Sequence, residues 1–118
     1  MANSKRQNRI SEEIRKKVSN MLLLEMDIPE FKFVTISSVK ISPDLSYCTI
    51  FYNIMERGPY SKNEIERLFT INRKRIRQNL SKKLNIKMTP ELKFIYDDTL
   101  DKAMVIESLL KGLNNKES

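Results

Sequence analysis

Six lysine or arginine side chains, and no acidic one, lie between residues 73 and 83 of this sequence. The apolar residues of the segment recur at helical spacing, which predicts a helix with Arg73, Lys74 and Arg77 projecting together from its outer face. Like charges one turn apart destabilise a helix by roughly 0.2–0.5 kcal/mol per pair, and a bound anion would relieve that repulsion. The pattern therefore favours phosphate binding, although a basic face that is only solvated fits the same residue types.

A second concentration of positive charge lies in residues 1–17, which hold six basic side chains and two acidic ones. Glu13 is spaced to pair with Lys17, so this segment is the weaker of the two indications. The whole chain carries a net charge of +7, which favours an anionic partner such as a nucleic acid. The side chains expected to contact a nucleic acid are Arg6, Arg9, Lys16, Arg73, Lys74, Arg77, Lys82 and Lys83.

The amino-acid composition lacks the residue types that common catalytic sites need. The chain has no histidine and only two glycines, so it can hold neither a Ser-His-Asp or Cys-His unit nor a glycine-rich phosphate loop. Cys48 shares the apolar face of a predicted strand, which indicates a buried thiol without a functional role. Asp97 and Asp98 precede a predicted helix, where capping is the better explanation. We therefore expect no enzyme activity, no metal site, no cofactor and no small-molecule substrate.

The elements that must position the basic residues begin with a helix, after a polar tail over residues 1–7 that we expect to be disordered. A strand follows over residues 33–41. Its apolar positions change parity across Ser37 and Ser38, which predicts a β-bulge there, unless the strand is buried on both faces. A proline-containing turn leads into a second strand over residues 47–54, so the two strands form an antiparallel hairpin.

The helical period returns after the hairpin, with one irregularity. Asn72 falls on the apolar stripe, and asparagine is a poor residue inside a helix because its amide competes for backbone hydrogen bonds. We therefore predict two helices, over about residues 62–71 and 74–84, with a kink at Asn72, Arg73 and Lys74.

The chain is completed by a third strand over residues 91–96 and a last helix over residues 100–112. A tail over residues 113–118 is expected to be disordered. The order α-β-β-α-α-β-α predicts an α+β fold in a single domain over residues 8–112. One cysteine and the absence of any apolar stretch long enough to span a bilayer favour a cytoplasmic protein.

Several segments, in this order and spacing, resemble the ribosome-binding factor A family over about residues 6–110. The most specific of them are the Ser-Pro-Asp-Leu-Ser turn and the Pro-Glu-Leu-x-Phe-x-x-Asp stretch. The segments that carry the resemblance are residues 6–10, 34–39, 42–47, 75–77, 89–94 and 96–100.

The resemblance implies a KH-like fold of type II, with a three-stranded sheet and helices on one face. It also implies binding to the small (30S) ribosomal subunit and RNA-binding support of 16S rRNA maturation, with importance in cold adaptation. Members of the family join their two central helices by a kink with an Ala-x-Gly pattern. This sequence has Asn72, Arg73 and Lys74 at the matching positions.

The function that these observations favour is ribosome biogenesis, by electrostatic docking of a monomer on folded ribosomal RNA. The expected partners are the small ribosomal subunit and 16S rRNA, with no membrane contact. An alternative of a different class is a basic protein–protein adaptor that binds an acidic partner without RNA contact. A nuclease is a third possibility, but the chain lacks histidine and a convincing acidic metal cluster.

Overall fold

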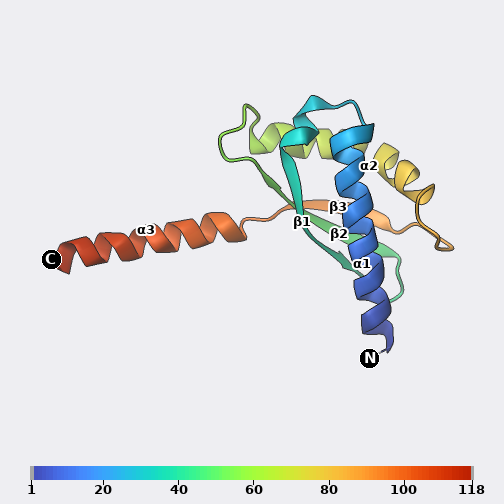
Figure 1. Ribbon diagram of the computed structural model, residues 1–118, viewed down its shortest axis with the longest axis horizontal. Coiled ribbons are helices and arrows are strands. Elements are labelled where there is room, and N and C mark those ends of the chain that lie inside the picture. The colour runs from blue at the N-terminus through green and yellow to red at the C-terminus, as the bar shows by residue number, and fades with distance from the viewer. Residues whose placement is uncertain (1, 118) are drawn as a thin grey trace.

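The first helix, α1 (Ala2–Asn20), is built on a stripe of apolar residues four positions apart. Ile10, Ile14 and Val18 of this stripe are buried, and a π-helical turn over Met21–Glu25 continues it. The computed structural model of the chain describes residues 2–117, and α1 is the blue helix of Figure 1. This stripe holds α1 against the core and leaves its opposite face to solvent.

The beginning of α1 differs from the sequence-based expectation. The helix starts at Ala2, within the segment of residues 1–7 for which the sequence predicted a disordered tail. One contact of this segment reaches the sheet: the side-chain amide of Gln7 donates a hydrogen bond to the carbonyl oxygen of Ile41 at 3.0 Å. The acceptor lies 34 positions away, so no local pattern could indicate it.

Three strands form one mixed sheet in the order β1-β2-β3. The strands β1 (Val34–Ile41) and β2 (Tyr47–Ile54) are antiparallel, as the hairpin prediction required. The third strand, β3 (Glu91–Tyr96), pairs in parallel with β2. The predicted α+β class and its three-stranded sheet are thereby confirmed.

The predicted β-bulge is present in β1. Ile36 pairs with Tyr52 and Ser38 pairs with Phe51, so Ser37 is the extra residue between them. The bulge keeps the apolar residues on both of its sides directed at the same core, although their sequence parity differs. The hydroxyl of Ser37 faces outward and donates to a carboxylate oxygen of Asp97 at 2.8 Å.

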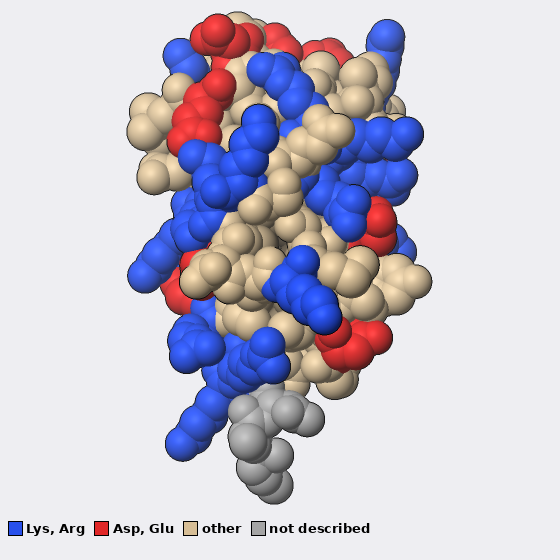
Figure 2. Space-filling view, turned by 90° about the vertical axis from the view of Figure 1, so that its right-hand side faces the viewer, with Lys and Arg blue, Asp and Glu red and all other residues tan. Residues whose placement is uncertain are grey.

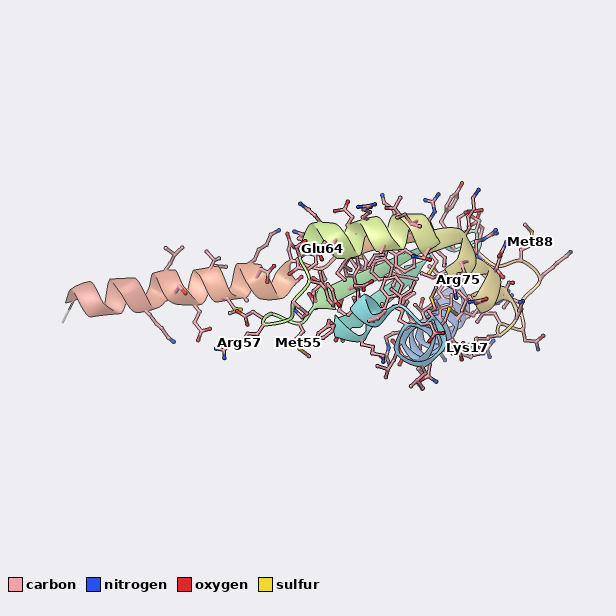
Figure 3. The ribbon with its side chains drawn as sticks, turned by 90° about the horizontal axis from the view of Figure 1, so that it is seen from above. Lys17, Met55, Arg57, Glu64, Arg75 and Met88 are labelled. Atoms are coloured by element: carbon pink, nitrogen blue, oxygen red, sulfur yellow. The ribbon has the colours of Figure 1, made fainter. Side chains whose placement is uncertain are left out.

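The second helix, α2 (Lys62–Ser81), begins at Ser61, whose hydroxyl accepts the backbone N–H of Glu64 at 3.2 Å. It is one continuous helix, so the two helices predicted over about residues 62–71 and 74–84 belong to a single element that ends at Ser81. The ribbon of α2 nevertheless changes direction in its second half (Figures 1 and 3). Asn72 donates through Nδ2 to the carbonyl oxygen of Leu68 at 2.8 Å, which satisfies its amide without breaking the helix.

The core lies between the sheet and the two helices α1 and α2. Its centre is Phe69 of α2, whose ring stacks on Phe31 at 4.8 Å and on Phe94 at 4.3 Å between ring centroids. The side chains of Lys40 and Lys93, on the other face of the sheet, are exposed. Helices therefore cover one face of the sheet, as expected for a KH-like fold.

The last helix, α3 (Thr99–Glu117), projects away from the body of the protein (Figure 1). It runs past residue 112, so the tail expected to be disordered over residues 113–118 is helical through Glu117. Gly112 does not end the helix and has no neighbour within 4 Å of a Cβ placed there. Because α3 does not pack on the core, five of its apolar side chains are 42–64% exposed: Met104, Val105, Ile106, Leu109 and Leu110.

Candidate nucleic-acid interface

Basic side chains gather at one end of the molecule. Figure 2 shows the face that lies at the right-hand side of Figure 1, and lysine and arginine cover much of it. The amino-terminal part of α1, the second half of α2 and the loop that leads from α2 to β3 meet at this end. The two basic segments, more than 50 positions apart in the sequence, thus contribute to one face.

The α1 contribution comes from side chains on its solvent face. Arg6, Arg9 and Lys16 are exposed there. Lys17 pairs with Glu13 at 2.6 Å, which confirms the predicted ion pair within this helix. Arg15, which was not among the residues expected to bind, forms an ion pair with Glu12.

On α2, the structure brings the three central candidates together. Arg73, Lys74 and Arg77 line one shallow hollow of about 200 Å³, together with Gln78 and Glu91. Arg73 and Lys74 are exposed, and neither makes an ion pair within the described part of the chain. Arg73 and Lys74 are therefore the exposed cations that line this hollow without an ion pair among the described residues.

Arg77 does not project freely into solvent, as the sequence predicted, but is held by hydrogen bonds within the protein. Its Nε donates to the carbonyl oxygen of Pro90 at 3.0 Å, and its Nη2 donates to that of Thr89 at 2.7 Å. Glu91 approaches the same Nη2 at 3.6 Å, and the Arg77 side chain is only 37% exposed. The guanidinium fork thus holds the loop that precedes β3 against α2. Sequence reasoning missed this role because both acceptors are backbone carbonyls more than ten positions away.

The end of the basic segment is partly paired. Lys82 is exposed, whereas Lys83 contacts a carboxylate oxygen of Glu25 at 2.8 Å. The ammonium of Lys17 also donates to the main-chain oxygen of Lys83 at 2.6 Å, which ties α1 to the end of α2. Because exposed ion pairs contribute about 0–1 kcal/mol, Lys83 can exchange its partner for a phosphate at small cost.

A larger hollow of about 520 Å³ adjoins the basic face. It lies between Arg6 of α1, the turn that joins β1 to β2, and the loop before β3. Lys87 lines it and is a cation that the sequence reasoning did not select, because residues 84–118 hold nearly equal numbers of basic and acidic side chains. The position of Lys87 beside this hollow is visible only in the structure, where the loop before β3 approaches Arg6.

Cys48 is 1% exposed, which confirms the prediction of a buried thiol. Burial raises the pKa of the thiol to about 12, so the reactive thiolate is scarce at neutral pH. Among the described residues, no three histidine, cysteine, aspartate or glutamate side chains are grouped closely enough to hold a metal ion. Within the same part of the chain, no helix combines the length and apolar character needed to cross a membrane.

Comparison with known proteins places these observations in a family. The family model described as ribosome-binding factor A matches residues 6–110. The chain belongs to the ribosome-binding factor A family. The ribosome-binding factor A of Geobacter metallireducens is 34% identical over 113 residues, covering 96% of this chain and 95% of the relative. That of Leuconostoc mesenteroides is 32% identical over 116 residues, covering 98% and 99%.

Solved structures of the ribosome-binding factor A family share the fold. The crystal structure of the Thermus thermophilus protein matches with a TM-score of 0.66 at 14% identity, covering 76% of this chain and 93% of that one. A solution structure from Thermotoga maritima, of a protein assigned to the family, matches with a TM-score of 0.61 at 24% identity. It covers 76% of this chain and 85% of its own. The resemblance drawn from the sequence is thereby confirmed, as is the KH-like fold.

One local feature of this family member concerns the expected kink. Where the resemblance predicts an Ala-x-Gly joint between two helices, Asn72, Arg73 and Lys74 lie inside the continuous helix α2. The positions of α2 that match the family's joint therefore carry two exposed cations, Arg73 and Lys74. Whether the change of direction of α2 is centred on these residues stays a prediction.

Proposed function

We propose that the chain is a ribosome-assembly factor that binds the small (30S) ribosomal subunit and assists maturation of 16S rRNA. Membership of the ribosome-binding factor A family supports this proposal. So does a homology model of the Thermus thermophilus family member, which was fitted into the cryo-EM map of its 30S complex and has a TM-score of 0.61 to this structure. The observation that carries the proposal is the basic face of Figure 2, on the side to which α1 and the second half of α2 both contribute, together with the exposure of Arg73 and Lys74 on α2.

The mechanism is electrostatic docking. Lysine and arginine side chains on a rigid scaffold neutralise phosphates and release counterions, which gives affinity without reading base sequence. Arg6, Arg9 and Lys16 supply one side of this surface, and Arg73 and Lys74 supply the other. A protein that binds one conformation of folded RNA more tightly shifts the population toward that conformation during maturation. No cofactor takes part, and one copy of the chain suffices.

In this surface, Arg77 positions the loop before β3. Its guanidinium is engaged by the carbonyls of Thr89 and Pro90, so it positions the loop beside the cations and contacts phosphate only through its remaining N–H groups. A variant that removes Arg77 would mix a folding defect with a binding defect. The test of RNA binding therefore uses the two exposed cations alone.

The test is co-sedimentation of the double variant Arg73→Gln/Lys74→Gln with separated 30S and 50S subunits over a series of salt concentrations. The wild type should bind 30S subunits, and the variant should bind more weakly. Removing one phosphate-binding cation should flatten the plot of log affinity against log salt by about 0.7–0.9, so the double variant should flatten it by about 1.4–1.8. Folding should be preserved, because the change removes repulsion between like charges.

The matched control is Arg57→Gln/Lys111→Gln, which removes the same charge from two exposed residues. Arg57 lies at the other end of the body from Arg75 (Figure 3), and Lys111 is in α3, which projects away. The control should bind as the wild type does. Equal weakening in both variants would mean that only net charge matters. Binding to the subunit's proteins after nuclease treatment would instead support the acidic-partner adaptor.

A further inference from the structure

The hollow of about 520 Å³ has the size of a ligand site, since such sites span about 300–1,000 Å³. Three segments distant in sequence form it: the amino-terminal part of α1, the turn that joins β1 to β2, and the loop before β3. The hollow faces the same end of the molecule as the basic side chains of α1 and α2. The mechanism proposed above uses only the phosphate-binding cations around it and leaves the hollow itself without a role.

The apolar side chains of the hollow divide into a floor and a rim. Leu45 and Ile86 are partly buried and packed against the core, so they form the floor. Tyr47 and Met88 form the rim, where they are 67% and 75% exposed. A large aromatic ring and a flexible thioether left in water present apolar area that a flat ligand can cover.

The charged side chains at the hollow are Arg6, Arg77, Lys87, Asp44 and Glu91. Three of them already have partners within the protein. Arg77 is held by the carbonyls of the loop and lies 3.6 Å from Glu91. Asp44 accepts hydrogen bonds from the hydroxyls of Ser42 and Ser46, each at 2.7 Å. The cations left for a ligand are therefore Arg6 and Lys87.

We propose that this hollow holds one unstacked nucleotide of single-stranded RNA, with its base on the ring of Tyr47 and its phosphates beside Arg6 and Lys87. An RNA strand offers a planar base and an anionic phosphate within one nucleotide, which matches an exposed ring and two cations that line the same hollow. An acidic peptide would satisfy the cations and leave the ring uncovered. The inference rests on the proposed function, because it names the part of the RNA that the protein takes.

The experiment exploits the absence of tryptophan from the chain. The substitution Tyr47→Trp introduces a single indole at the hollow, and Met55→Trp introduces one at a residue that is 59% exposed and lies far from Met88 (Figure 3). The probes are a short single-stranded RNA of mixed sequence and an abasic ribose-phosphate oligomer of the same length. Stacking should quench the indole of Tyr47→Trp with the RNA only, and the indole of Met55→Trp with neither probe.

Affinity provides the second readout. Tyr47→Ala should weaken binding of the RNA by about 5- to 150-fold, the range for one base stacked on an aromatic ring, and should leave binding of the abasic oligomer unchanged. Tyr47→Phe keeps the ring and should bind the RNA as the wild type does. The inference is overturned if the abasic oligomer quenches as strongly as the RNA, or if Tyr47→Ala binds the RNA with unchanged affinity.

The outcomes separate this inference from the function on which it rests. If the wild type and Tyr47→Ala both sediment with 30S subunits and no quenching occurs, the base site is refuted and the proposed function stands. If the wild type does not sediment with 30S subunits at all, the proposed function fails, and this inference fails with it.

Discussion

Arg77 of α2 donates a hydrogen bond through Nη2 to the carbonyl oxygen of Thr89, with 2.7 Å between the two atoms. This contact and its companion to Pro90 fasten the loop before β3 to the helix that carries the exposed cations. The same loop brings Lys87 and Met88 to the hollow beside Arg6. One arginine therefore links the surface proposed to bind phosphate to the proposed nucleotide site.

The first prediction concerns this link. Arg77→Gln should lower the free energy of unfolding by about 1–2 kcal/mol, because it removes charge-assisted donors from two carbonyls at a partly exposed site. Arg77→Lys should recover only part of this stability, since an ammonium lacks the planar fork that reaches both oxygens. Urea denaturation measures both. The control, Arg73→Gln, is exposed and should change the value by less than about 0.5 kcal/mol.

The second prediction concerns the turn between β1 and β2. Hydrogen bonds from Ser46 and Ser42 lower the pKa of Asp44 from 3.8 to about 2. Because the folded pKa lies below the unfolded one, Asp44 stabilises the folded protein above pH 4, and this contribution is lost as the pH falls toward 2. The melting temperature of Asp44→Asn should lie below that of the wild type at pH 6. A gap between the two that persists unchanged at pH 2 would contradict this assignment.

A third prediction follows from the burial of Cys48. Alkylation by iodoacetamide at pH 8 should be slow in the native protein and fast in urea, because burial raises the pKa of the thiol to about 12. Cys48→Ala should cost about 1–2 kcal/mol of stability through the small cavity it leaves. Sedimentation of Cys48→Ala with 30S subunits should match the wild type. Normal stability together with an absence of binding would assign the thiol a function.

The fourth prediction concerns the bulge in β1. Deleting Ser37 should prevent folding, because a shift of one residue turns every apolar side chain on one side of the bulge toward solvent. Ser37→Ala keeps the extra residue and removes only exposed hydrogen bonds, so it should fold with a destabilisation of no more than about 1 kcal/mol. Circular dichroism distinguishes the two. A folded deletion variant of normal stability would mean that the register can slip without cost.

Periodic features of this protein were predictable from its sequence. The bulge followed from the changed parity of apolar residues around Ser37 and Ser38, and the burial of Cys48 followed from its alternation with Ile50. The concentration of charge in residues 73–83 was equally visible. All of these depend on neighbours within a few positions, where helix and strand geometry determines which side chains share a face.

The tertiary structure alone decided the remaining features. The engagement of Arg77 by two backbone carbonyls, and the approach of Lys87 to Arg6, join segments whose sequence spacing carries no signal. The projection of α3 was equally hidden, since apolar residues at helical spacing predict a helix but not what it packs against. In each case the partner of a side chain is set by how the chain packs in three dimensions, which residue types and periodicity do not encode locally.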